Sequence, residues 1–366
     1  MKFKQQINGL HAYQPGKTSD EVKKMFNLEK VTKLASNENP YGASPKVKEY
    51  FANANLDFAI YPDGYASNLR TAVANHLNVS EKQLLFGNGS DENILIVSRA
   101  ILRPGLNTVM ADLTFGQYKH NAVVEGAEVR EIPLTRNGEH DLDSMLAAVD
   151  ENTAIIWVCN PNNPTGTLTP SDKLKDFIEK VPTDVLIVLD EAYTEYITDN
   201  NYKDSIGLLE NHPNILIMRT FSKAYGLASF RVGYAIGSEE VIAMLEPTRE
   251  PFNNTVISQQ LAVIGLGDQS FIEQCKVRNS DGKAQFVTYC QERNLDYFPS
   301  QTNFILMEVK ADSDVVFQGL MKRGFIVRSG NAVGKPGYLR ITIGTEQQNT
   351  ELLEKLDEVL SEEGVL

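Results

Sequence analysis

The sequence predicts an α/β fold in which helices cover both faces of a mostly parallel sheet, with a smaller α+β domain after it. Short apolar runs alternate with helix-like segments up to Glu246-Pro247, and this alternation is typical of such a sheet. Beyond that point, helical stretches surround strand-like runs in a different order. A chain of 366 residues also exceeds one typical hydrophobic core. We therefore predict an N-terminal arm packing on the small domain (residues 1–32), a large domain (33–246) and a small C-terminal domain (247–366).

Each predicted element follows from its own pattern: short apolar runs predict buried strands, and longer periodic segments predict helices. In the large domain we expect strands near residues 84–86, 107–110, 129–132, 154–159, 185–189, 214–219 and 232–236, and helices near 68–78, 91–102, 117–126 and 171–180. In the small domain we expect helices near 255–266, 270–292 and 312–323, and strands near 303–308, 325–328 and 338–343. Parallel sheets bind ligands outside the carboxyl ends of their strands, so polar residues directly after these strands are the first functional candidates.

Composition excludes several classes of function. Hydrophobic residues make up 42% and charged residues 23%, as in a soluble metabolic enzyme. The net charge of −13 argues against nucleic acid or an anionic membrane as a partner. The three cysteines are too few and too irregularly spaced for a disulfide framework or a zinc site, and no histidine cluster has metal-ligand spacing. No signal peptide or membrane-spanning run is recognisable, so we expect a cytoplasmic protein that needs no metal.

A lysine after a buried strand is the first candidate functional residue. The apolar run 215–218 leads into Ser222 and Lys223, and Arg231 follows shortly afterwards. Lysine forms Schiff bases with aldehydes, and pyridoxal phosphate (PLP) is the commonest protein-bound aldehyde. An arginine nearby would pair with the phosphate of such a group. Because most lysines are solvated surface charges, this interpretation needs a partner for the ring nitrogen of the cofactor.

Asp190, at the end of the apolar run 185–189, is the candidate for that partner. A carboxylate at the end of a buried strand must be paired, and a protonated pyridine nitrogen would pair it. The contact would keep the ring cationic, so that the ring accepts electrons from a carbanion at the substrate's Cα. An N-cap or an Asx turn is the alternative for Asp190 alone, but its combination with Lys223 favours the functional role.

Two loops complete the pattern. Residues 160–166 follow a strand and contain two prolines and a glycine, which predict a rigid loop whose asparagines could donate to a phenolate oxygen. The alternative there is an ordinary tight turn. Residues 87–92 (GNGSDE) lie between a strand and a helix, and free N–H groups at such a helix start bind phosphate. The segment lacks the third glycine of a dinucleotide fingerprint and the Gly-Lys-Ser/Thr of a P-loop, which disfavours a nucleotide site.

With these four features in order, the chain resembles the fold-type I PLP-dependent aminotransferases of class II, and among them the histidinol-phosphate aminotransferase family. The resemblance runs from about Tyr13 to about Gly344, nearly the whole chain. It rests on HAYQPG (11–16), LASNENPYG (34–42), YPDG (61–64), GNGSDE (87–92), NPNNPTG (160–166), DEAY (190–193), the segment around Lys223 and LRITIG (339–344).

The resemblance implies a role for each matching residue at the cofactor. Lys223 would hold PLP and move the proton between Cα and C4′, with its pKa lowered by burial and by cationic neighbours. Asp190 would pair with the pyridinium nitrogen, while Asn163 and Tyr193 would hydrogen-bond the phenolic oxygen. Phe115 would stack on the ring, with ordinary core packing as the alternative. The phosphate would be held by Gly89, Ser90, Asp91, Ser222 and Arg231.

The resemblance also implies a substrate and an assembly. The reaction would be transamination of L-histidinol phosphate with 2-oxoglutarate, giving imidazole-acetol phosphate and glutamate in histidine biosynthesis. Tyr13, Asn39, Arg328 and Arg340 would bind the substrate, with surface positions at strand edges as the alternative for the two arginines. Tyr61 would reach the phosphate from a second copy, which makes the protein a homodimer with shared active sites.

Two other enzyme activities remain open from the sequence alone, and one function outside enzymes is disfavoured. An aromatic amino acid aminotransferase and a PLP-dependent decarboxylase of a phosphorylated amino acid would use the same cofactor residues. A PLP-binding transcription regulator would need a DNA-binding module with a basic recognition helix, and the residues before Tyr13 leave no room for one.

Overall fold

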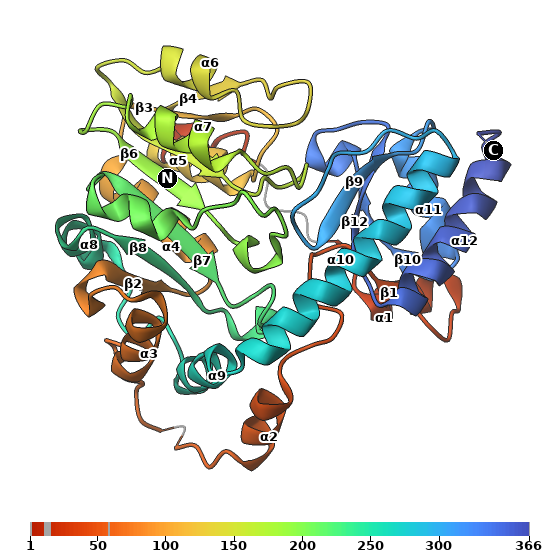
Figure 1. Ribbon diagram of the computed structural model, residues 1–366, viewed down its shortest axis with the longest axis horizontal. Coiled ribbons are helices and arrows are strands. Elements are labelled where there is room, and N and C mark those ends of the chain that lie inside the picture. Colours follow the sequence, from red (N-terminus) through yellow and green to blue (C-terminus); the bar gives the residue numbers. More distant parts are fainter. Residues whose placement is uncertain (1, 11–15, 58, 366) are drawn as a thin grey trace.

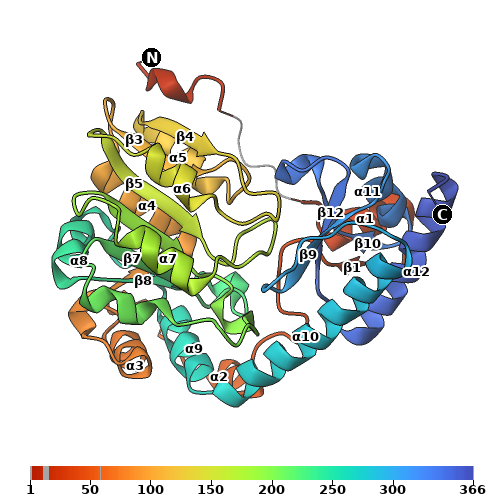
Figure 2. The same cartoon turned by 45° about the horizontal axis from the view of Figure 1, so that its top comes forward.

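The computed structural model describes residues 2–10, 16–57 and 59–365. These residues form two layered bodies that lie side by side (Figures 1 and 2). The large body is built on a seven-stranded sheet and the small body on a three-stranded sheet. One long helix, α10 (Gln269–Glu292), runs from the large body to the small one in both views.

The sheet of the large body has the order β2-β8-β7-β6-β5-β3-β4. Only β8 runs antiparallel to its neighbours, so the sheet is mostly parallel, as predicted. All seven predicted strands are present: β2 (Leu84–Gly87), β3 (Asn107–Ala111), β4 (Glu128–Ile132), β5 (Thr153–Cys159), β6 (Leu186–Asp190), β7 (Ile215–Thr220) and β8 (Gly233–Gly237).

Two hydrophobic clusters cover the two faces of this sheet because successive strand side chains point to opposite sides. In β5, for example, Ile156 and Val158 belong to one cluster, while Ile155 and Trp157 belong to the other. The first cluster packs under α2 (Pro45–Asn53), α3 (Ser67–Leu77), α6 (Leu142–Ala147), α7 (Ser171–Ile178) and α9 (Val256–Leu266). The second packs under α4 (Ser90–Ile101), α5 (Gln117–Glu125) and α8 (Glu239–Leu245).

The small body combines an antiparallel sheet, β11-β12-β9, with helices α11 and α12 and the C-terminal part of α10. A parallel pair, β1-β10, joins the segment before the large body to the small body. The run 325–328, predicted as one strand, is divided because β10 pairs with β1 whereas β11 pairs with β12. The bounds are β1 (Thr32–Lys33), β9 (Phe304–Glu308), β10 (Phe325–Ile326), β11 (Arg328–Ser329), β12 (Tyr338–Thr342), α11 (Ser313–Lys322) and α12 (Glu346–Glu362).

The N-terminal segments contact both the large body and the small body. Helix α1 (Ser19–Phe26) packs its buried Val22 with Met321 and Ile326 of the small body. Near the N-terminus, Lys4 instead bonds to the Val124 carbonyl oxygen and to Glu125 at the end of α5. Helix α9 lies beyond residue 246, yet it packs in the core of the large body.

The architecture brings several strand ends to one edge of the large sheet. Cys159 at the end of β5 is the register partner of Asp190 at the end of β6, and Asp190 in turn pairs with Met218 of β7. Residues that follow β5, β6 and β7 therefore meet at the side of the sheet that faces the small body. Within the described residues, no helix is both long and apolar enough to cross a bilayer.

Candidate active site

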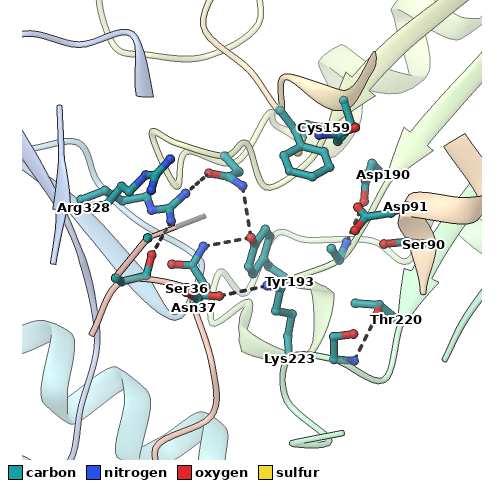
Figure 3. A pocket seen from close by; sticks show the side chains of 18 of the residues that line it. Ser36, Asn37, Ser90, Asp91, Cys159, Asp190, Tyr193, Thr220, Lys223 and Arg328 are labelled. Atoms are coloured by element: carbon teal, nitrogen blue, oxygen red, sulfur yellow. Dashed lines mark hydrogen bonds between the residues drawn. The ribbon is translucent and has the colours of Figure 1, made fainter. Parts of the chain in front are cut away.

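A cavity of about 430 Å³ opens where the strand ends of the large body face the small body. Figure 3 shows side chains from both bodies pointing into it. Many of the residues selected from the sequence line this cavity: Ser90, Asp91, Phe115, Asn163, Asp190, Tyr193, Ser222, Lys223, Arg231, Arg328 and Arg340. The fold thus gathers residues that are far apart in the sequence around a single space.

Lys223 lies in the turn after β7 and reaches into the cavity. Its Nζ donates to the carbonyl oxygen of Ser36 over 3.3 Å and lies 5.6 Å from the centre of the Tyr193 ring. Burial lowers the pKa of Lys223 to about 8, and the positive charge of Arg340 acts in the same direction. A substantial fraction of this amine is therefore neutral near physiological pH, as a nucleophile or a general base requires.

The Asp190 carboxylate lies at the deep end of the cavity and is only 3% exposed. Its Oδ2 accepts a 2.6 Å bond from the Tyr118 hydroxyl, and its Oδ1 accepts a 3.2 Å bond from the Ala192 amide. Burial raises the pKa of Asp190 to about 6, while these two donors oppose that rise. The carboxyl group is therefore mainly ionised at neutral pH, and it would pair with a cationic nitrogen placed in the cavity.

A chain of hydrogen bonds crosses the middle of the cavity (Figure 3). The Tyr193 hydroxyl accepts bonds from Nδ2 of Asn163 at 3.3 Å and from Nδ2 of Asn37 at 3.0 Å. Oδ1 of Asn163 in turn accepts a 2.8 Å bond from Nη1 of Arg340. Burial raises the pKa of Tyr193 far above its ordinary value, so the phenol stays protonated and can donate to an oxygen in the cavity.

One corner of the cavity has the features of an anion site. Helix α4 begins there at Ser90, after Gly89 with its left-handed φ of 79°. Arg231 donates from Nη1 to Ser222 Oγ and from Nη2 to Asp91 Oδ2, both over 3.3 Å. The helix N-terminus, the two serine hydroxyls and the guanidinium together suit a phosphate. Only the backbone amide of Asp91 suits an anion, because its side chain is itself negative.

The opposite end of the cavity carries two arginines from the small body. Arg328 of β11 and Arg340 of β12 are direct partners across an antiparallel pair, so their side chains lie on the same face of the sheet. Both line the cavity. Nη2 of Arg340 also donates to the carbonyl oxygen of Ala35 over 2.8 Å, which fixes the direction of its guanidinium. The cavity therefore has a cationic clamp well suited to a carboxylate or a phosphate.

A family model described as aminotransferase class I and II matches residues 29–356. The chain belongs to this family. A histidinol-phosphate aminotransferase of Lysinibacillus sphaericus (strain C3-41) is 60% identical, over 100% of this chain and 100% of its own length. The histidinol-phosphate aminotransferase of Bacillus subtilis (strain 168) is 53% identical, over 98% of this chain and 100% of its own length. The aminotransferase fold expected from the sequence is confirmed.

Solved structures of this fold agree with these matches. The histidinol-phosphate aminotransferase from Sinorhizobium meliloti in complex with pyridoxal-5′-phosphate superposes with a TM-score of 0.89 and 25% identity, and the match covers 99% of this chain and 98% of that one. An aspartate aminotransferase from Thermus thermophilus with maleate reaches a TM-score of 0.82 at 20% identity, covering 98% and 100%. The second likeness concerns the fold alone.

Some predicted residues of this aminotransferase lie outside the cavity. Asn39 is buried, and its Nδ2 donates to the carbonyl oxygen of Ala224, the residue after Lys223, over 2.8 Å. Gly89 lies against the Arg231 guanidinium, which a Cβ at this position would overlap. Tyr61 is 78% exposed and stacks on Phe252, with ring centres 4.8 Å apart. Tyr13 lies outside the described residues.

Other residues in or next to the aminotransferase cavity were not selected from the sequence. Asn37 belongs to the motif at 34–42. Its φ of 58° and its bonds to Tyr193 and Thr342 cannot be predicted from the residue type alone. Tyr118 lies at the start of a predicted helix, where nothing in the sequence indicates a bond to Asp190. The cavity is also lined by Gly16, Ala35, Ser36, Gln117, Cys159, Ala192 and Thr220. Burial raises the pKa of the Cys159 thiol, so it is not a nucleophile.

Proposed function

We propose that this aminotransferase uses PLP to transfer an amino group between L-histidinol phosphate and 2-oxoglutarate, in histidine biosynthesis. The observation that carries the proposal is the position of Lys223 between the buried Asp190 and the arginine pair, in one cavity. Curated relatives with 52–60% identity over nearly their full length are named histidinol-phosphate aminotransferase, which supports the choice of substrate.

The residues of the cavity fit PLP. The cofactor, when bound, supplies an aldehyde and a cationic ring that accepts the electrons of the substrate's Cα. Asp190 is the buried carboxylate that would pair with the ring nitrogen, and Tyr193 and Asn163 would donate to the phenolic oxygen. Phe115 would cover the ring. The phosphate would occupy the corner formed by the backbone at Gly89–Asp91, with Ser90, Ser222 and Arg231 around it.

Lys223 would carry the proton between the two reacting carbons. Its pKa of about 8 leaves a neutral fraction that can take the proton from Cα, and the resulting ammonium can return that proton at C4′. The Ser36 carbonyl oxygen accepts from Nζ and would help to hold the amine within the cavity. The lysine thus acts first as a base and then as an acid.

Substrate choice would depend on Arg328 and Arg340. A transaminase must accept two amino donors in one pocket, and each of these donors carries an anionic end: the phosphate of histidinol phosphate or a carboxylate of glutamate. A forked guanidinium binds either group. We propose that Tyr13 closes over the phosphate, although it lies outside the described residues. Asn39, which bonds to the backbone of the residue after Lys223, would then act on the substrate only through the position of that lysine.

We also propose a homodimer with shared sites. Ile60, Tyr61, Tyr65 and Phe252 are exposed, Tyr61 stacks on Phe252, and exposed large apolar side chains favour association with another protein. Tyr61 of the partner subunit would reach the phosphate corner.

We propose a division into an arm, a large domain and a small domain, starting from the bounds expected from the sequence (1–32, 33–246 and 247–366). The separate core under α11 and α12 supports this division. The packing of α9 on the large body favours moving the second boundary into α10. A cytoplasmic location is proposed from the biosynthetic role.

An assay of the purified protein with histidinol phosphate and 2-oxoglutarate tests the function directly. Glutamate formation should depend on added PLP after the cofactor has been dialysed away. Histidinol and phenylalanine, supplied at the same concentration, should be turned over far more slowly. Equal turnover of phenylalanine would support an aromatic amino acid aminotransferase instead, and release of carbon dioxide from threonine phosphate would support a decarboxylase.

A further inference from the structure

We propose that Tyr118 is a positioning residue whose hydroxyl holds the Asp190 carboxylate in the direction that binds the ring nitrogen of the cofactor. The inference rests on the proposed function, because it requires PLP as the bound group. It adds a residue outside the lining of the cavity to the machinery of the site.

Neighbouring aromatic rings fix the orientation of the Tyr118 side chain. The side chain is fully buried, and its ring stacks on Trp157 with centres 4.8 Å apart and planes 10° apart. The Phe115 ring meets it edge-on at 5.7 Å. With the ring held on both sides, the position of the hydroxyl is fixed, and it donates to Asp190 Oδ2 over 2.6 Å.

This bond matters because Asp190 has few other ways to keep its orientation. Its Oδ1 accepts only the longer 3.2 Å bond from the Ala192 amide, which leaves the carboxylate free to turn about that contact. A short bond from a rigid phenol removes this freedom. It also fixes which lone pairs of the carboxylate remain available on the cavity side for a cationic N–H donor.

The charged and titratable groups that face Asp190 come from several elements. Asp91 of α4 disfavours its negative charge, whereas Lys223 after β7 favours it, and the Cys159 thiol of β5 lies nearby in its neutral form. Tyr193, which follows β6, also faces it and stays protonated. In contrast to these neighbours, the uncharged Tyr118 hydroxyl donates a hydrogen bond directly to the Asp190 carboxylate. Removing that donor should make the carboxylate more basic, so that it draws the proton from the ring nitrogen and weakens the cationic character of the ring.

Replacing Tyr118 by Phe tests the proposal because it removes the hydroxyl and keeps the ring between Trp157 and Phe115. The apo-protein of Tyr118→Phe should bind PLP roughly tenfold more weakly than wild type, the expected loss for one hydrogen bond to a charged group. In the cofactor-bound protein, the pH midpoint of the cofactor absorbance should rise, because a less cationic ring holds the proton on its imine nitrogen more tightly. In an Asp190→Asn background, the same substitution should change PLP affinity little, since the charge that it positions is gone.

A matched control is available in the small body. There the Tyr289 hydroxyl donates to Asp357 Oδ1 over 2.7 Å, far from the cavity, and Tyr289→Phe should change neither PLP affinity nor the absorbance midpoint. A Tyr118→Phe protein with wild-type affinity and midpoint would overturn the inference. If Tyr118→Phe does not fold, 3-fluorotyrosine at position 118 keeps the shape and strengthens the donor. It should lower the midpoint, and an unchanged midpoint would equally overturn the inference. Failure of the wild-type protein to bind PLP would instead refute the proposed function.

Discussion

Arg340 and Asn163 meet across the cavity, with Nη1 of the arginine donating to Oδ1 of the asparagine over 2.8 Å. The arginine comes from β12 of the small body, and the asparagine comes from the loop after β5 of the large body. Because Asn163 also donates to Tyr193, the substrate end of the cavity is connected to its cofactor end through two hydrogen bonds. Contact between the two bodies is thereby coupled to the arrangement of the catalytic groups.

Arg340→Ala should remove most of the preference for a phosphorylated substrate. We expect kcat/KM for histidinol phosphate to fall about a hundredfold, the usual cost of losing a charged partner, while the value for histidinol falls much less, through the lost bond to Asn163 alone. Steady-state kinetics with both substrates measure this ratio. Arg136→Ala, at an exposed position on the large body, is the matched control and should behave as wild type. An unchanged ratio in Arg340→Ala would show that the phosphate is bound elsewhere.

Lys223 should be the lysine that holds PLP covalently. Treatment of the cofactor-bound protein with borohydride, followed by peptide mapping, should find the label on Lys223. Lys283 is an internal control, because burial also lowers its pKa to about 8 but its Nζ bonds to the Ser300 carbonyl oxygen outside the cavity. Labelling of Lys283 instead of Lys223 would mean that reactivity follows the pKa and not the site. Lys223→Ala should bind PLP without a covalent bond and lose turnover.

Asp190→Asn should slow transamination by on the order of a hundredfold or more, because the amide has the same shape without the charge that pairs with the ring nitrogen. Pre-steady-state measurement of the half-reaction with histidinol phosphate isolates this step from product release. Asp204→Asn offers a comparison at a partly exposed aspartate that pairs with Arg219 away from the cavity. A wild-type half-reaction rate in Asp190→Asn would make Asp190 a structural residue only.

Asp190→Asn, although it should slow the reaction, should make the apo-protein more stable. The pKa of Asp190 is raised from 3.8 to about 6 in the folded state, so folding favours the protonated form. The free energy of folding that the protonated Asp190 contributes is fully present below pH 4 and is lost as the pH rises through about 6. At pH 7 we expect apo Asp190→Asn to be about 2–3 kcal/mol more stable than wild type, and the difference should vanish near pH 4. Urea unfolding at the two pH values measures it; an equal difference at both would contradict the assigned ionisation.

Shared active sites predict complementation between two inactive variants. Lys223→Ala subunits mixed with Tyr61→Phe subunits should form hybrids in which one site lacks both groups and the other is intact. After unfolding and refolding together, the mixture should recover activity up to about a quarter of the wild-type value, beyond either parent alone. The absence of recovery, or a monomer in analytical ultracentrifugation, would count against the shared sites.

Much of the large body could be predicted from the sequence because its central strands are buried on both faces and therefore appear as continuous apolar runs, unlike the edge strand β4. Helix α12 was not predicted, although Thr345 and Gln348 form a capping box at its start. In the site, Asp190 and Lys223 could be selected because Asp190 ends one buried strand and Lys223 lies in the turn after another. Asn37 and Tyr118 could not, because their roles depend on contacts with residues far away in the chain, to Tyr193 and Asp190 respectively.

The separate origins of the two ends of the cavity have an evolutionary consequence. The residues proposed to hold the cofactor come from the large body, whereas the two arginines that face the substrate come from neighbouring strands of the small body. Substitutions on β11 and β12 can therefore change which amino donor is accepted while the chemistry of amino transfer is retained. Such a division allows an ancestral enzyme to diversify into several specificities by changing only a few positions in one short hairpin-like region.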